Sequence, residues 1–343
     1  MRCPTLKELP LPPSAKTGWP WTEGSPQLPD SMSDGLPWPK ISIVTPSFNQ
    51  GQFIEETIRS VLLQGYPDLE YFIIDGGSKD DSVDIIKKYE QWLAYWVSEP
   101  DRGQSHAINK GFARASGEIY AYLNSDDLYE PGCCHIVSQH FIKVCKPNLI
   151  IGKCIFFNKI GTKSISNPVW PDELEEFLYP LSLTFGQPSA FWSSNLYRFL
   201  VSFDETLNFC LDLDFFLRAG LKGIQPEMIP NILSRFRNYG DHKSRSQILL
   251  CYKETIMLID KLGTMCGLSE NEKTKRIGGI LEDIEYVKIL LTWKTKGRIH
   301  AIFNYAALLL RSPKLILQRR FLGLGRRILY FSPDRVMEME RIL

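Results

Sequence analysis

An alternation of strand-like and helix-like segments constrains the fold of this chain most strongly. Short runs rich in β-branched and aliphatic residues occur at 41–45, 69–74 and 119–123. Residues 54–63 and 80–89, which follow the first two runs, carry apolar side chains at helical spacing. Strands that alternate with helices in this way predict an α/β fold with a mainly parallel central sheet.

Further local patterns predict the remaining organisation of the chain. Residues 95–97 read as a short strand, and Ser105 is expected to cap a helix that runs to about residue 115. Residues 1–39 hold nine of the 22 prolines and three of the eight tryptophans, so they are expected to form an extended strap on the domain or a partly disordered leader. The predicted domains are this strap, an α/β domain at 40–245 and a helical basic region at 246–343.

Polar clusters follow three of the predicted strands, where ligands collect in parallel sheets. They are Thr45-Pro46-Ser47, Asp75-Gly76-Gly77-Ser78 and Asn124-Ser125-Asp126-Asp127. Adjacent carboxylates after a buried strand are costly unless a cation or ligand compensates them, and Mg²⁺ and Mn²⁺ prefer oxygen ligands. The Asp126-Asp127 pair therefore indicates a metal site, or else a turn that caps the helix near Pro131.

Two other groups of carboxylates have both a chemical and a structural interpretation. Asp75 could accept a hydrogen bond from a nucleobase or ribose, or it could cap a helix after the turn. Asp212 and Asp214 point in different directions if they begin a helix, so one could act as a general base while the other braces the loop. Alternatively, the helix is simply capped and Arg218 pairs with a carboxylate. Neither a dinucleotide-binding fingerprint nor a P-loop is present in the sequence.

Together these motifs resemble family 2 glycosyltransferases, which have the GT-A fold. The resemblance spans roughly residues 40–245. It rests on an ordered set of motifs, namely 43–49, 55–64, 74–78 with Asp80 and Ser82, 99–104, 107–111, 117–118, 123–127, 187–189 and 212–218. Asn124 stands where many members have the first Asp of the metal motif, and Leu211 stands where the family has Glu before the base.

The resemblance implies a role for each matching residue. The nucleotide pocket would contain Thr45, Pro46, Asp75, Asp101, Arg102, Gln104 and Asp126. The metal, Mn²⁺ or Mg²⁺, would be held by Asp126 and Asp127, with His242 as a further ligand. The catalytic base would be Asp212, and the acceptor side would be supported by Gln187, Asp214 and Arg218.

The implied reaction is an inverting transfer from a nucleotide-diphosphate sugar, with UDP as the expected nucleotide. Asp212 would take the proton of the attacking hydroxyl, and the metal and Arg102 would offset charge on the departing diphosphate. Asp214 would raise the pKa of Asp212 by like-charge repulsion.

The charge is distributed unevenly, although the chain has a net charge of only +1. Residues 286–333 contain ten Lys and Arg and no acidic residue. Such basic amphipathic segments bind anionic membrane surfaces. The alternative is a helical subdomain that packs on the domain or forms a homodimer. Near-neutral overall charge and the absence of a known binding motif argue against nucleic acid as a partner.

The sequence also predicts a location and an acceptor class. No apolar leader follows the start, and the eight cysteines lack zinc spacing, so free thiols in a cytoplasmic protein are expected. With the basic region, this predicts a peripheral enzyme on the inner face of a membrane that acts on a glycan or lipid-linked acceptor in polysaccharide biosynthesis. The rivals are transfer to a soluble or protein acceptor, and a catalytically silent nucleotide-sugar-binding scaffold. Intact Asp126, Asp127 and Asp212 disfavour the scaffold.

Overall fold

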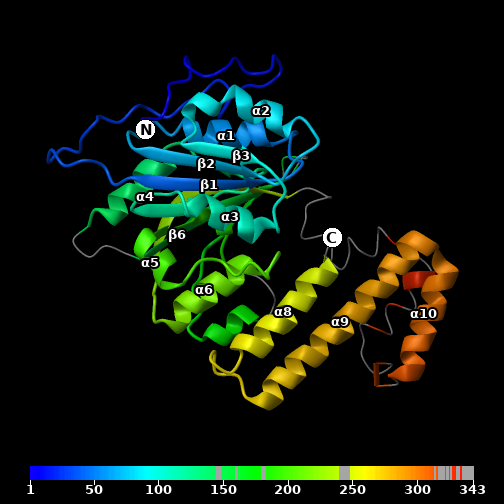
Figure 1. The fold of residues 1–343 in the computed structure, drawn as a ribbon. Helices are drawn as coiled ribbons and strands as arrows, with labels where there is room; N and C mark the ends of the chain where they lie inside the picture. Colours follow the sequence, from blue (N-terminus) through cyan, green and yellow to red (C-terminus); the bar gives the residue numbers. More distant parts are fainter. Residues whose placement is uncertain are drawn as a thin grey trace. The chain divides into compact units, whose positions relative to one another are not determined.

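The computed structural model divides the chain into two compact units, Met1–Tyr239 and Gly240–Leu343 (Figure 1). The structure describes residues 1–143, 148–158, 161, 163–178, 183–238, 248–312, 314–315, 321, 324, 327–329 and 333. The first unit is built on a sheet, and the second is helical.

The described residues of the first unit form a nine-stranded sheet in the order β3-β2-β1-β4-β8-β6-β9-β5, with β7 paired to β6. The strands are β1 (Ile41–Ser47), β2 (Leu69–Asp75), β3 (Tyr95–Ser98), β4 (Ile119–Tyr122), β5 (Leu128–Tyr129), β6 (Leu149–Phe157), β7 (Lys163–Ile165), β8 (Ala190–Ser193) and β9 (Glu227–Arg237). Strands β3, β2, β1 and β4 pair in parallel, which confirms the predicted α/β fold.

Helices cover both faces of this parallel part, with α1 and α2 on one side and α3 on the other (Figure 1). All seven residues of β1 are buried, as expected for a central strand between two helical layers. The helices of this unit are α1 (Ile54–Leu62), α2 (Ser82–Lys88), α3 (Gln104–Phe112), α4 (Cys133–Phe141), α5 (Ser194–Phe199) and α6 (Leu211–Leu221), with 3₁₀ turns at Glu90–Trp92, Leu174–Leu178 and Gln187–Ser189.

The start of α3 differs from the predicted cap. Gly103 occupies the N-cap with φ of 116°, and a Cβ there would lie 2.2 Å from Oδ1 of Asn208. The hydroxyl of Ser105 instead donates to the carbonyl of Leu207 at 2.6 Å. The prediction of a Ser105 cap was wrong because this residue is used for a long-range contact, which local sequence does not reveal.

The N-terminal segment packs on α1 and on the turn that follows it. Trp21 and Trp38 are buried, and the indole of Trp19 donates to the carbonyl of Tyr129 at 2.9 Å. Arg59 of α1 is fully buried against the segment. Gly65 lies so close to the segment that a Cβ would approach the carbonyl oxygen of Pro26 to 2.2 Å.

The second unit confirms the predicted helical C-terminal region. Its helices are α8 (Ile248–Leu262), α9 (Glu270–Lys296) and α10 (Arg298–Arg311). Ser269 and Glu272 form a capping box at the start of α9, and Gly297, with φ of 86°, separates α9 from α10. No helix in the described part of the chain is long and apolar enough to cross a membrane.

Candidate active site

The three polar clusters lie at one edge of the sheet because β1, β2 and β4 run parallel. Ser47 pairs with Asp75 across β1 and β2, and Val44 pairs with Tyr122 across β1 and β4. Thr45 is fully buried, and its hydroxyl lies 3.0 Å from that of Tyr71 on the neighbouring strand β2. Its side chain therefore points into the protein interior. Pro46, also buried, extends this strand toward the edge.

Asp75 organises the turn that follows β2. The carboxylate is buried and accepts hydrogen bonds from the amides of Gly77 and Ser78 and from the hydroxyls of Ser78 and Ser98. Helix α2 begins only at Ser82, so Asp75 does not cap it. Its four hydrogen bonds fix the shape of the loop that follows β2.

Asp127 is a buried carboxylate in a tight turn after β4. Its Oδ1 accepts the amide of Arg237 at 3.0 Å, and its Oδ2 lies 3.3 Å from Nδ2 of Asn124. Burial raises the pKa of Asp127 well above its usual value, and the charge of Asp126 raises it further. Gly132 occupies the N-cap of α4, so the alternative in which these aspartates cap that helix does not hold.

Arg237 ends β9 and braces this turn. Its Nε donates to the carbonyl of Asp126 at 2.9 Å, and its Nη2 donates to Glu56 of α1 at 2.9 Å. The guanidinium carbon lies 4.7 Å from the ring centroid of Phe53 and 4.6 Å from that of Phe157. A cation held between two rings and a carboxylate is a rigid support.

We expect Arg237→Met to lower the free energy of unfolding by about 2–4 kcal/mol, because it leaves Glu56 and the Asp126 carbonyl without their partner. Urea denaturation measures this. Adding Glu56→Gln should restore part of the loss. Arg102→Met is the control, since its ion pair with Glu205 is exposed and should contribute at most about 1 kcal/mol. Equal effects of the two arginine variants would contradict the bracing role.

Two neighbouring loops reach the same edge of the sheet. Nε2 of Gln104, the first residue of α3, donates to Oδ1 of Asn124 at 2.7 Å. A Cβ on Gly76 would lie 2.9 Å from Oδ2 of Asp101, whose Oδ1 accepts the amide of Gly103 at 2.8 Å. The structure therefore brings together the predicted residues Asp75, Asp101 and Gln104 with the Asn124–Asp127 turn.

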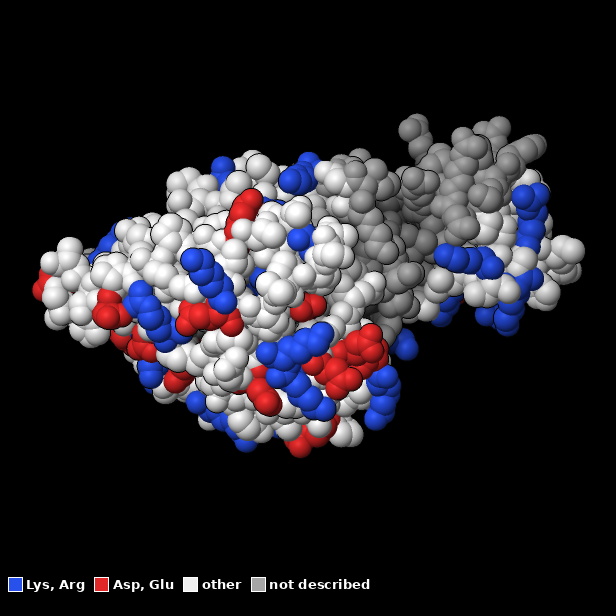
Figure 2. Space-filling view, turned by 90° about the horizontal axis from the view of Figure 1, so that it is seen from above, with Lys and Arg blue, Asp and Glu red and all other residues white. Residues whose placement is uncertain are grey.

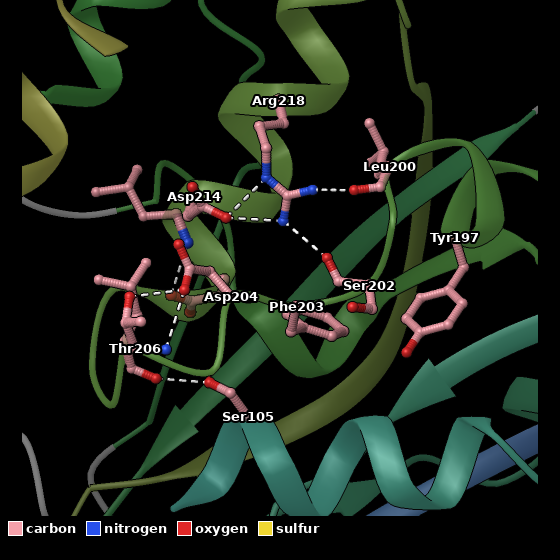
Figure 3. Close-up of polar contacts among 12 residues, drawn as sticks. Ser105, Tyr197, Leu200, Ser202, Phe203, Asp204, Thr206, Asp214 and Arg218 are labelled. Atoms are coloured by element: carbon pink, nitrogen blue, oxygen red, sulfur yellow. Dashed lines mark hydrogen bonds and ion pairs between the residues drawn. The ribbon is translucent and has the colours of Figure 1, made fainter. Parts of the chain in front are cut away.

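Residues 200–208, which we call the bridging loop, lie between α5 and α6 in the chain and contact α3. Asn109 of α3 donates to the carbonyl of Phe203 at 2.9 Å and accepts its amide at 3.1 Å. Ser105 binds Leu207 in the same loop (Figure 3). Arg102 forms an ion pair with Glu205, and its side chain is 68% exposed. In this structure Arg102 thus faces the bridging loop.

The other end of the bridging loop is held by α6 (Figure 3). Arg218 contacts the buried carboxylate of Asp214 through Nε at 2.8 Å and Nη2 at 2.7 Å. It also donates to the carbonyls of Leu200 and Ser202. Arg218 offsets the charge of Asp214, so the expected repulsion between Asp214 and Asp212 is weakened at its source.

Tyr122 ends β4, and its phenol is buried. Burial raises the pKa of Tyr122, and the negative charges of Asp212 and Asp127 raise it further. Gln187 donates to the carbonyl of the same tyrosine at 3.2 Å, and its buried Oε1 has no partner among the described residues. The charges of the predicted base and of the predicted metal motif therefore both act on Tyr122, and Gln187 contacts the backbone of the same residue.

Sequence reasoning missed several members of this arrangement and placed one outside the described residues. Tyr122, Arg237 and Asn109 were not predicted, although the last lies within a motif that carries the family resemblance. His242 lies outside the described residues. Within the described ranges, no three His, Cys, Asp or Glu side chains are grouped to hold a metal ion.

Comparisons with known proteins show which proteins this chain is similar to. The family model described as glycosyl transferase family 2 matches residues 42–193. An uncharacterized glycosyltransferase of Mycobacterium tuberculosis is 31% identical over 216 residues, which cover 61% of this chain and 80% of that protein. A Campylobacter jejuni protein named GalNAc(5)-diNAcBac-PP-undecaprenol beta-1,3-glucosyltransferase is 31% identical over 105 residues, covering 29% of this chain and 34% of its own length.

A solved structure shares the fold. The crystal structure of S. aureus TarS 1-349 in complex with UDP-GlcNAc matches with a TM-score of 0.51 and 18% sequence identity, and the match covers 83% of each chain. At this identity the likeness concerns the fold alone.

Proposed function

Because the chain belongs to glycosyl transferase family 2 and has the GT-A fold, we propose that it transfers a sugar from a UDP-sugar to a hydroxyl of a glycan or lipid-linked acceptor. The observation that carries this proposal is that Tyr122 feels the charges of both Asp212 and Asp127, while Gln187 contacts its backbone carbonyl. This supports a role for the α6 carboxylate near the end of β4, where we propose that the donor diphosphate binds. The name of the C. jejuni relative supports a lipid-linked acceptor.

In the proposed reaction Asp212 takes the proton of the acceptor hydroxyl while that oxygen bonds to the anomeric carbon. The bond from this carbon to the diphosphate breaks on the opposite face, so the configuration inverts and the electron pair leaves with the diphosphate. The vacant Oε1 of Gln187 would accept a hydrogen bond from a sugar hydroxyl. Asp75 and Asp101 would shape the nucleotide pocket through the loops that they hold.

The carboxylates at this edge suit a divalent cation. Asp126 and Asp127 are neighbours in the turn, and the charge of Asp126 raises the pKa of the buried Asp127, an effect that a bound cation would offset. We propose that they hold Mg²⁺ or Mn²⁺, with His242 as a further ligand. When bound, the cation would offset the negative charge of the diphosphate.

Asp127→Asn tests this site. We expect the variant to lose the metal-dependent part of its thermal stabilisation by UDP, because the amide accepts the Arg237 hydrogen bond but carries no charge for the cation. The measurement is the melting temperature with UDP, with and without Mn²⁺, and after chelation. Asp84→Asn, at an exposed position of α2, is the control and should behave as the wild type. Unchanged metal dependence in Asp127→Asn would overturn the assignment.

The transferase itself is tested by incubating the chain with a panel of nucleotide sugars, Mn²⁺ or Mg²⁺ and acceptor pools, and measuring nucleotide release. Release that depends on a glycan or lipid-linked acceptor supports the proposal, whereas a preference for protein acceptors would redirect it. If UDP stabilised the chain but no sugar turned over with any acceptor, the protein would be a binding scaffold.

Action on a lipid-linked acceptor fits a cytoplasmic enzyme held peripherally at the inner face of a membrane. We propose that the basic segment 286–333 makes this contact, and that a homodimer is the competing use of the same segment.

A further inference from the structure

Helix α10 is apolar on two opposite faces. Its inner face contributes Ala301, Tyr305 and Leu308 to a core with Trp293 of α9. Its outer face carries four large apolar side chains at exposed positions, namely Ile299, Ile302, Phe303 and Leu310. The inner face alone accounts for the packing of α10 within its unit, so the outer face requires another explanation.

The outer residues form one continuous stripe. Their spacing of three, four and eleven residues from Ile299 places them on the same side of a helix. Ile299, Phe303 and Leu310 are 69%, 70% and 83% exposed, and Ile302 is 39% exposed. Such a stripe on a helix surface is typical of a binding face.

Basic residues flank this stripe along the chain. Lys294, Lys296 and Arg298 precede it, Arg311 and Lys314 follow it, and no acidic residue occurs from 286 to 333. Figure 2 shows blue Lys and Arg side chains without red on the visible described surface of α10 and the end of α9. Along the chain, basic residues alone therefore bound the stripe of large apolar side chains, while Glu282 and Glu285 of α9 line a pocket with Arg311 and Lys314.

This combination selects the partner. A second copy of the chain bound by a two-fold axis would bring like charges together around the stripe. A helix of 14 residues is about 21 Å long and cannot span a bilayer. Positive charge around an apolar stripe complements the interface of an anionic bilayer, where headgroups meet the basic side chains and acyl chains receive the apolar ones.

We infer that α10 lies in the plane of an anionic lipid surface and inserts Ile299, Phe303 and Leu310 below the headgroups. This inference rests on the proposed peripheral membrane contact of the basic segment. Beyond that electrostatic contact, it states that one face of α10 inserts into the bilayer. It is independent of the transfer reaction, which the test does not measure.

The experiment measures sedimentation of the full chain with vesicles of phosphatidylcholine, with and without phosphatidylglycerol. We expect binding to require phosphatidylglycerol and to weaken as salt rises. The double variant Phe303→Ser/Leu310→Ser should bind these vesicles at least about tenfold more weakly than the wild type. The matched control, Leu11→Ser/Leu36→Ser, removes two exposed leucines of the first unit and should bind as the wild type.

The outcomes separate the inference from the broader proposal. Salt-sensitive binding that the Phe303/Leu310 variant leaves unchanged would overturn insertion by α10 and retain a contact by charge. No binding to either vesicle would overturn both. A dimer in sedimentation equilibrium that this variant dissociates would assign the stripe to a second copy instead. Equal melting temperatures of all variants show that the comparison concerns binding.

Discussion

Asp212→Asn is expected to lower the rate of sugar transfer by about 10²- to 10⁴-fold while leaving UDP affinity nearly unchanged. The amide keeps the size of the side chain and its Oδ1, which accepts the amide of Leu213 at 2.8 Å. It cannot take up the proton of the attacking hydroxyl at neutral pH. The measurement is the rate of acceptor-dependent UDP release at saturating donor, together with a titration of UDP binding.

Asp214→Asn is the informative comparison, because it lies two residues away and serves a different purpose. Its carboxylate is fully buried and paired with Arg218, so removing the charge should lower the free energy of unfolding by about 3–5 kcal/mol. Asp212→Asn should stay close to wild-type stability. If Asp212→Asn lost UDP binding along with activity, Asp212 would be a structural residue and the assignment of the base would be wrong.

Arg59→Met is expected to lower the free energy of unfolding by about 3–5 kcal/mol, as much as Asp214→Asn. The Arg59 side chain is fully buried and donates to the carbonyls of Pro20, Pro10 and Trp21 at 3.0, 2.9 and 2.9 Å. It also donates to the hydroxyl of Tyr89 at 3.2 Å. Methionine fills the space but leaves these oxygens buried without a donor.

Urea denaturation measures the loss, and limited proteolysis shows where it acts. Cleavage within residues 1–39 should become faster in Arg59→Met than in the wild type, because the N-terminal segment loses its anchor. Arg59→Lys should fall between the two, since an ammonium group cannot reach three carbonyls in the fork geometry of a guanidinium. Wild-type stability in Arg59→Met would show that the packing of the tryptophans alone holds the segment.

Local sequence was sufficient to predict the parallel half of the sheet. The apolar residues of β1 and the helical spacing of Ile54, Ile58 and Val61 are properties of neighbouring residues, and the structure confirms both elements. The polar clusters were also predictable in position, because a residue that ends a parallel strand must lie at the same edge as its neighbours.

Contacts between distant segments could not be predicted in the same way. Arg237 contacts Glu56, which lies 181 residues earlier in the chain. Its guanidinium also lies over the rings of Phe53, just before α1, and Phe157, at the end of β6. Ser105 is a residue type that commonly caps helices, yet its hydroxyl donates to the carbonyl of Leu207. Nothing in the neighbourhood of these residues encodes the partner, since the partner is set by the pairing of β6 with β9 and by the path of the bridging loop.

The bridging loop has a consequence for exchanging segments between this chain and its relatives. Asn109 on α3 and Arg218 on α6 both hydrogen-bond to backbone atoms of this loop. The two helices and the loop are therefore structurally coupled. A chimera that replaces α6 alone would separate Arg218 from the carbonyls that it was matched to. A segment grafted from a relative should therefore include all of residues 200–218. Ser105 and Asn109 should be retained, because they hydrogen-bond to this segment.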